Sequence, residues 1–269
     1  MSSHDAVLAS HQARIQRLVA RFQGHNGFDR ALLLHWLGQF ALEDIELALR
    51  VLENVIYFTR TNIRGLAEQM VDLTFAHLDA VPDEKVLFVF AGDIWESDAL
   101  VARIVRYDRR VPERQLAQYT ELASLDPGDW QAVVVLKDFA GTGQQLADWW
   151  DSAEPLILPL EVEVVLGVLV LNGAAMERLE RLGPSILVVR QLNDGNNVFH
   201  DECTRFSEGE KEIILRYCRR TAASDEYLRG RGANGLLVAF DHFCPNNSLP
   251  VLWHGSGSWT ALFGRHALQ

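Results

Sequence analysis

Residues 133–146 constrain the fold of this chain more than any other stretch. Val133 to Leu136 form a continuous apolar run, as in a strand buried on both faces. One acid, Asp138, follows, and then the short loop Gly141-Thr142-Gly143 before a helical pattern begins. Glycine lets backbone amides approach an anion closely, and the positive end of a helix attracts negative charge. This order predicts a phosphate-binding loop, with an acid placed to reach a ribose hydroxyl or a metal ion.

The pattern of apolar strands and intervening helices repeats from residue 85 onward. Apolar runs predict strands over 86–90, 131–136, 163–171, 185–191 and 235–240. Between them, helices are expected over 97–107, 143–151, 174–182 and 208–220, the last opened by a capping box at Ser207 and Glu210. Such units predict a parallel α/β sheet covered by helices on both faces. Loops at the carboxyl edge of this sheet should converge on one site, and they are 91–97, 137–145, 192–200 and 241–254.

The first 80 residues show helical periodicity and no strand pattern. Helices are predicted over 11–23, 29–40, 43–58 and 62–77. Pro82-Asp83 marks a boundary. We therefore predict two parts, an all-helical N-terminal segment (1–80) and an α/β domain (81–269).

Composition excludes several classes of protein. The chain is 48% hydrophobic with a formal net charge of −11, which argues against non-specific binding to nucleic acid through bulk charge. The chain has three cysteines, Cys203, Cys218 and Cys244. Their odd number and wide spacing predict no disulfide framework and are typical of a protein in a reducing compartment. The chain opens without the apolar run of a signal peptide, and its most apolar segment, 155–171, is short for a membrane span. We expect a cytoplasmic protein that does not enter the membrane.

The sequence of the loop at 137–145 allows several interpretations. An ordinary strand-to-helix turn, with Gly and Thr as turn and cap residues, is one alternative. A dinucleotide-binding fingerprint does not fit, because Leu146 stands where a third glycine is required. A Walker-type loop does not fit either, because no Gly-Lys-Ser/Thr follows.

This segment resembles the PRPP-binding motif of type I phosphoribosyltransferases. Asp138 matches the second of the two acids in that motif, and Thr142-Gly143 match its loop. Lys137 stands in place of the first acid, and Gln145 in place of a phosphate-binding hydroxyl residue. The resemblance implies that Asp138 contacts the ribose hydroxyls. It also implies that the 5′-phosphate binds Ala140, Gly141, Thr142, Gly143 and Gln144.

The C-terminal part carries a second resemblance. Residues 237–253, LVAFDHFCPNNSLPVLW, look like the C-terminal signature of a phosphoribosyltransferase-like family of bacterial conflict and defence loci, some of them beside retrons. Residues 36–40 and 259–265 are similar as well, so that the resemblance spans about 28–266. It implies a phosphoribosyltransferase-like fold and a role in antiphage defence.

Further candidate ligands of a bound molecule lie in the other loops. We predict Mg²⁺ at Asp93 and Asp138, because this ion prefers carboxylates together with phosphate oxygens; a solvated turn is the alternative for the loop around Asp93. The tail would form a lid or contact a base through His242, Asn246, Asn247 and Trp253, or else be a structural turn rich in Asn and Pro. A zinc site at His200, Cys203, His242 and Cys244 lacks the usual ligand spacing.

Two functions follow. The first is an enzyme that transfers or hydrolyses a phosphoribosyl group at ribose C1, with Lys137 and Asp138 in the catalytic site. The second is a nucleotide-sensing or scaffold subunit without turnover, which Lys137 and Gln145 favour. In that case the N-terminal helices, with Arg60, Asn62 and Arg64, would dock a defence-system protein or an RNA–DNA element. Self-association is compatible with both functions.

Overall fold

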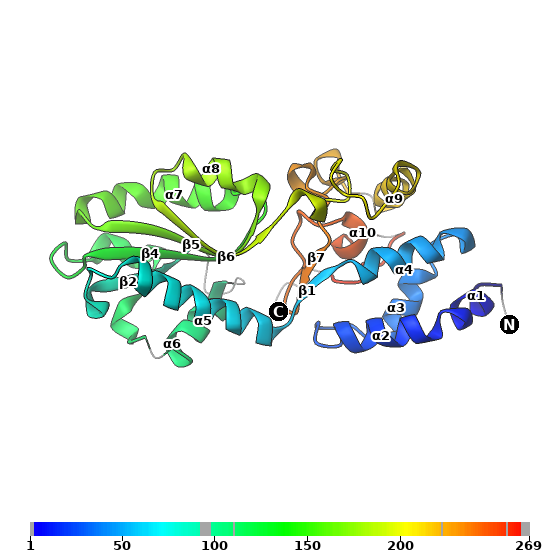
Figure 1. The fold of residues 1–269 in the computed structure, drawn as a ribbon, viewed down its shortest axis with the longest axis horizontal. Helices are drawn as coiled ribbons and strands as arrows, with labels where there is room; N and C mark the ends of the chain where they lie inside the picture. The colour runs from blue at the N-terminus through cyan, green and yellow to red at the C-terminus, as the bar shows by residue number, and fades with distance from the viewer. Residues whose placement is uncertain (1–2, 92–97, 110, 222, 257, 265–269) are drawn as a thin grey trace. The chain divides into compact units, whose positions relative to one another are not determined.

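The computed structural model describes residues 3–91, 98–109, 111–221, 223–256 and 258–264 (Figure 1). The chain forms two compact units. Unit 1 contains residues 1–60 and 194–269, and unit 2 contains residues 61–193.

Unit 2 is built on a parallel sheet of five strands in the order β3-β2-β4-β5-β6. The strands are β2 (Val86–Phe90), β3 (Leu116–Gln118), β4 (Ala132–Ala140), β5 (Glu163–Asn172) and β6 (Ser185–Leu192). β2 and β4 are buried along their whole length, as their unbroken apolar runs predicted. The predicted parallel α/β sheet is thus confirmed. β3 was not predicted, because a strand of three residues between short 3-10 turns is too short to show a pattern of apolar residues.

Helices cover both faces of this sheet (Figure 1). α7 (Gln144–Ile157) and α8 (Met176–Glu180) lie on one face, and α5 (Arg60–His77) and α6 (Asp98–Tyr107) lie on the other. On the α7 face, Val133 and Val135 share a buried cluster with Leu146. On the α5 face, a Cβ at Gly167 would lie 3.0 Å from the Sδ atom of Met70, so glycine permits the close approach of that helix.

Unit 1 is mostly helical. Its helices are α1 (Ser3–Ser10), α2 (Gln12–Phe22), α3 (Arg30–Leu37), α4 (Ile45–Glu53), α9 (Glu208–Arg220) and α10 (Pro250–Trp253). α9 opens with the predicted capping box, in which Ser207 and Glu210 exchange side-chain-to-backbone hydrogen bonds. A second, two-stranded parallel sheet pairs β1 (Ile56–Phe58) with β7 (Val238–Phe240).

The N-terminal segment differs from the prediction of an all-helical 1–80. α4 ends at Glu53 and the chain then forms β1, whose partner β7 is distant in the sequence. β7 was expected to join the larger sheet, but pairs with β1 instead. The compact units therefore differ from the predicted division at residue 80, because the C-terminal residues 194–269 pack with residues 1–60.

Aromatic side chains from both ends of the chain explain this packing. Trp36 and Phe22 share a core with Trp259 and Phe263, and all four are almost fully buried. The indole N–H groups of Trp36 and Trp259 both donate to the carbonyl oxygen of Val251, at 2.8 and 3.2 Å. The tail that looked irregular in the sequence is therefore part of the core of unit 1.

Candidate functional site

The predicted phosphate loop follows the buried strand β4. Lys137 and Asp138 lie near the end of this strand and are 6% and 3% exposed. The Nζ atom of Lys137 lies 3.4 Å from Oδ1 of Asp138, and the same oxygen accepts a hydrogen bond from the backbone N–H of Phe139 at 2.7 Å. The two residues form a buried ion pair in which the ammonium group compensates the carboxylate.

Gly143 gives the loop its sharp turn into α7. Its φ of +73° lies in the left-handed region, which disfavours other residues. A Cβ at this position would lie 3.2 Å from Cδ2 of Leu179 and 3.3 Å from the carbonyl oxygen of Ala175. The loop thus packs tightly on the segment that follows β5, and glycine is required here.

Asn172, at the end of β5, stabilises the phosphate loop through a hydrogen bond to its backbone. This residue is 3% exposed, and its Nδ2 donates to the carbonyl oxygen of Gly141 at 3.2 Å. Because a trans peptide points its C=O and N–H in opposite directions, the N–H of Thr142 is directed away from Asn172. Sequence reasoning missed Asn172, although it directly follows Leu171, which pairs with Ala140 in the sheet register.

The amides of the loop are arranged to receive an anion. Within the described parts of the chain, the backbone N–H groups of Thr142, Gly143 and Gln145 have no hydrogen-bond acceptor. The N–H of Gln144 is satisfied by Oγ1 of Thr142 at 3.3 Å. Donors without acceptors at the start of a 14-residue helix combine directed hydrogen bonds with the positive end of the helix dipole.

Of the other predicted site residues in unit 2, one group lies in the loop, and Asp93 lies outside the described residues. Ala140, Gly141, Thr142, Gly143 and Gln144 come together in the loop with Lys137 and Asp138. The side chain of Gln144 is directed along α7, where its Nε2 donates to Asp148 at 2.6 Å. Asp93, the other predicted magnesium ligand, lies outside the described residues, and so does most of loop 91–97.

The predicted lid residues belong to unit 1 and bond within it. Asn247 donates through Nδ2 to the carbonyl oxygen of Arg231 at 2.9 Å, and the indole N–H of Trp253 donates to that of Ser248 at 3.0 Å. The carbonyl oxygen of Asn246 accepts from Arg231 at 2.8 Å, and the ring of His242 packs against Phe243. These contacts hold the turns of the tail, as the structural alternative for this segment predicted, and the lid remains a prediction.

A buried carboxylate in the tail, Asp241, was not singled out from the sequence. Its Oδ1 accepts a hydrogen bond from the hydroxyl of Tyr57, and its Oδ2 accepts from the N–H of Arg60 at 2.7 Å. Burial and the hydrogen bond to Asp241 raise the pKa of Tyr57, so that this hydroxyl stays a donor. A Cβ at Gly24 would lie 2.7 Å from Oδ1, so glycine makes room for the carboxylate. Asp241 therefore joins the ends of β1 and β7 to the backbone of Arg60, within unit 1.

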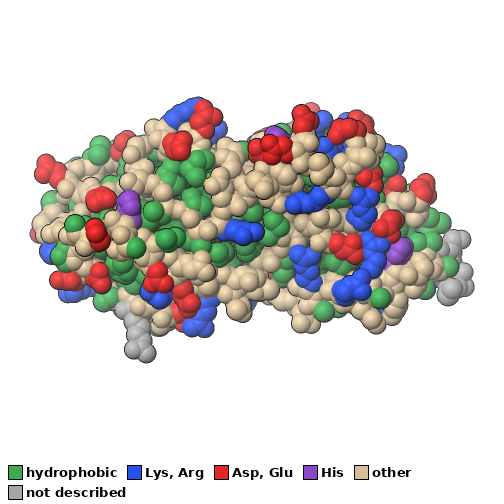
Figure 2. Space-filling model, viewed as in Figure 1, with side chains coloured by type: hydrophobic (Ala, Val, Ile, Leu, Met, Phe, Trp, Pro, Cys, Tyr) green, Lys and Arg blue, Asp and Glu red, His purple; other side chains and the backbone are tan. Residues whose placement is uncertain are grey.

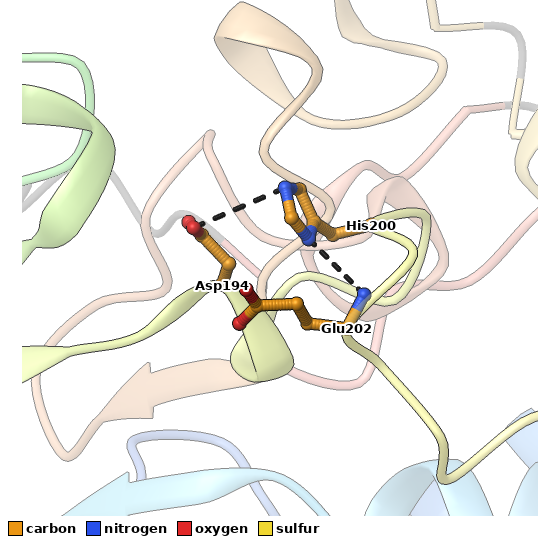
Figure 3. Close-up of side chains that lie close together, drawn as sticks. All are labelled: Asp194, His200 and Glu202. Atoms are coloured by element: carbon orange, nitrogen blue, oxygen red, sulfur yellow. Dashed lines mark hydrogen bonds and ion pairs between the residues drawn. The ribbon is translucent and has the colours of Figure 1, made fainter.

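One group of side chains in unit 1 has the composition of a metal site. Asp194, His200 and Glu202 place one potential ligand atom each within 4.8 Å of the others (Figure 3). However, Nδ1 of His200 accepts a hydrogen bond from the N–H of Glu202 at 3.2 Å. The proton of the neutral ring is then on Nε2, which faces Asp194 at 3.9 Å. The geometry favours an Asp–His contact over a metal ligand at Nε2.

The zinc alternative receives no support from this group. Cys203 and Cys244 do not take part in it, and both are buried. The thiol of Cys244 lies 3.4 Å from the carbonyl oxygen of Val238, to which it donates. Buried thiols of this kind pack as small apolar groups. In addition, none of the described helices is both long and apolar enough to cross a membrane.

No curated protein matches the chain. Among solved structures, an orotate phosphoribosyltransferase from Aeropyrum pernix is similar over 46% of this chain and 69% of that one, at 19% sequence identity. The TM-score of this pair is 0.31, which supports no inference about fold or function.

The family comparison extends over most of the chain. The PRTase-CE family matches residues 33–265, a stretch that includes β4, the phosphate loop and the tail. The match therefore covers parts of both compact units. The chain belongs to the PRTase-CE family.

Proposed function

We propose that residues 137–146 bind the phosphoribosyl group of a small molecule such as PRPP, and that the protein transfers or hydrolyses this group at ribose C1. The observation that carries the proposal is the set of loop amides, at Thr142, Gly143 and Gln145, that have no acceptor among the described residues. Membership of the PRTase-CE family supports the same ligand class.

Each part of the loop has a role in this proposal. The amides and the hydroxyl of Thr142 bind the 5′-phosphate, and the carboxylate of Asp138 accepts hydrogen bonds from the ribose hydroxyls. During the reaction the bond from C1 to the leaving pyrophosphate oxygen breaks, a bond to C1 forms from an acceptor or from water, and the proton of that nucleophile passes to solvent or to the released pyrophosphate. C1 becomes positively charged as this happens. The fixed carboxylate stabilises that charge electrostatically, and the bound phosphate positions the sugar.

Lys137 distinguishes this loop from the PRPP-binding motif described above, which has two adjacent acids. Its Nζ atom lies 3.4 Å from Oδ1 of Asp138, near the end of β4. We propose that it stabilises the anionic leaving group as a point charge. In the second candidate function, a nucleotide sensor or scaffold without turnover, the same pair would serve binding only.

Magnesium stays a prediction in this proposal. The Oδ1 atom of Asp138 already faces a cation and a backbone N–H, so this oxygen does not fit the requirements of a magnesium ligand. The other predicted ligand, Asp93, lies outside the described residues. We therefore derive no step through Mg²⁺.

The biological setting is a further part of the proposal. The resemblance of the tail to a family of defence loci supports a role in antiphage defence, in which the protein would consume or sense nucleotide precursors. Two of the arginines in the N-terminal segment are paired with acids, which reduces the charge that they offer to an RNA–DNA element. Arg14 is paired with Glu46 and Glu53, Arg64 with Glu68 and Asp108, and basic and acidic side chains lie side by side on the face shown in Figure 2. A protein partner is the better candidate.

Turnover of PRPP tests the proposal. The protein is incubated with PRPP, with and without Mg²⁺, and released pyrophosphate is followed by ³¹P NMR for the wild type and for Asp138→Asn. Release by the wild type that is lost in Asp138→Asn supports an enzyme. Binding without release supports the sensor. If neither binding nor release is seen, the enzyme is wrong, and nucleotides and partner proteins are then tested for the second function.

A further inference from the structure

Unit 2 contains a cavity that none of the loop residues 137–146 lines. The cavity, of about 570 Å³, lies at the β3 edge of the sheet, between α6 and residues 113–125. This volume is within the range of small-molecule sites in proteins. Its apolar wall includes Leu87 and Phe90 from β2 and Leu116 from β3.

The polar rim of this cavity is basic in an acidic protein. Three arginines, Arg103, Arg106 and Arg114, line it against two glutamates, Glu113 and Glu121, which leaves a local charge of +1. The whole chain has a formal charge of −11. At physiological salt, charges beyond about 8 Å are largely screened, so a ligand in the cavity responds mainly to the rim.

Both glutamates are already engaged by the protein. Glu113 forms an ion pair with Arg106, and Oε2 of Glu121 accepts from the N–H of Gln118 at 2.7 Å. Arg103 and Arg114, in contrast, form no ion pair within the described ranges of the chain. Two guanidinium groups from different elements are thus available to an anion in the cavity.

The number of acceptors distinguishes the anions that fit. A carboxylate has two oxygens and one negative charge, whereas a phosphate monoester has three terminal oxygens and a charge of about −1.5 to −2 at pH 7, so two guanidinium forks match the phosphate better. Inorganic phosphate alone would leave most of the cavity and its apolar wall unused. The ligand therefore needs an organic body as well as a phosphate group.

Tyr107 indicates the nature of that body. Its ring is 63% exposed at the cavity, and the guanidinium carbon of Arg106 lies 5.2 Å from the ring centroid. An exposed aromatic ring beside a guanidinium plane is a surface on which a nucleobase stacks. We propose that this cavity binds a nucleoside monophosphate, with Arg103 and Arg114 on the phosphate and Tyr107 against the base. The site is independent of the phosphoribosyl site proposed above.

Calorimetric titration of the full chain with AMP tests this inference. Adenosine and inorganic phosphate serve as partial ligands, and both should bind at least about tenfold more weakly than AMP, since a charge-assisted hydrogen bond contributes this much or more. The double substitution Arg103→Gln/Arg114→Gln should weaken AMP binding at least about tenfold, and each single substitution should weaken it less. Arg178→Gln, a change at an exposed arginine of α8 that forms no ion pair with the described residues, is the matched control.

AMP also contains a ribose 5-phosphate, so the phosphate loop needs its own control. Saturating PRPP, which occupies the loop, should leave AMP binding at the cavity unchanged. The inference is wrong if AMP does not bind, or if the double variant binds AMP as the wild type does. It is also wrong if PRPP abolishes AMP binding, because the loop would then be the AMP site. The thermal melting curve of the double variant should match that of the wild type, because both arginines are exposed.

Discussion

The buried pair Lys137–Asp138 makes a prediction that can be worked out from its geometry. Their side chains are 7% and 3% exposed, and Nζ lies 3.4 Å from Oδ1. At an effective dielectric constant of about 20, two unit charges at this distance attract by about 5 kcal/mol. Much of that attraction is offset by the desolvation of the two ions.

Three variants separate these effects: Asp138→Asn, Lys137→Met and the double substitution. Each single change removes the oppositely charged partner of a buried group, and we expect it to reduce the free energy of unfolding by up to about 3–5 kcal/mol. The double change removes both charges at once, and we expect it to be less costly than either single change. The coupling energy should therefore exceed about 2 kcal/mol.

Native-state hydrogen exchange, read on peptides of β4, is the appropriate assay. The chain has two compact units, and exchange in β4 reports on unit 2 alone. Asp151→Asn, an exposed carboxylate on α7, is the control and should leave exchange in β4 unchanged. Additive single substitutions, with a coupling energy below about 0.5 kcal/mol, would refute the buried ion pair.

Three further predictions concern the loop and the acid stability of unit 1. Gly143→Ala should lower stability by at least about 1 kcal/mol in a urea titration, because φ is +73° and the new Cβ would meet Ala175 and Leu179; an unchanged midpoint would contradict the tight packing. Asn172→Ala should lower the free energy of unfolding by about 1–3 kcal/mol, because the hydrogen bond from Nδ2 to the carbonyl oxygen of Gly141 is lost. It should also weaken binding of PRPP, and tight binding by this variant would show that the loop keeps its conformation without Asn172. The hydrogen bond from the N–H of Ser207 and, to a smaller extent, the contact with Arg50 lower the pKa of Glu210 in the folded state. The stability that Glu210 contributes is therefore complete above the ordinary carboxyl pKa and is lost as the pH falls through the lowered value. Glu210→Gln should accordingly flatten the acid limb of the melting temperature against pH, and parallel curves would contradict this assignment.

The sequence predicted those features of the fold that are encoded locally. β2 and α9 have the predicted bounds, because an unbroken apolar run and a capping box are each contained in a few adjacent residues. The phosphate loop was recognisable for the same reason, since strand, acid, glycines and helix follow one another directly.

Other features depend on contacts between distant parts of the chain. β1 is three residues long and exists because it pairs with β7, and the strand predicted at 235–240 pairs with β1 and not with the larger sheet. The role of Asn172 becomes visible only when the register places the end of β5 beside the loop. The tail looked like a possible lid because its Trp and Asn residues are polar or amphipathic, yet in the structure they bond to nearby backbone groups.

The measurement that tests the central claim most directly is calorimetric titration of the full chain with PRPP. The wild type should bind PRPP, Asp138→Asn should lose most of the affinity, and the control Asp151→Asn should bind as the wild type does. A thermal-shift experiment at about a hundred times the dissociation constant should then show about 2.7 kcal/mol of stabilisation. Absence of binding to the wild type, or equal binding by Asp138→Asn, would contradict the assignment of residues 137–146 as a phosphoribosyl site.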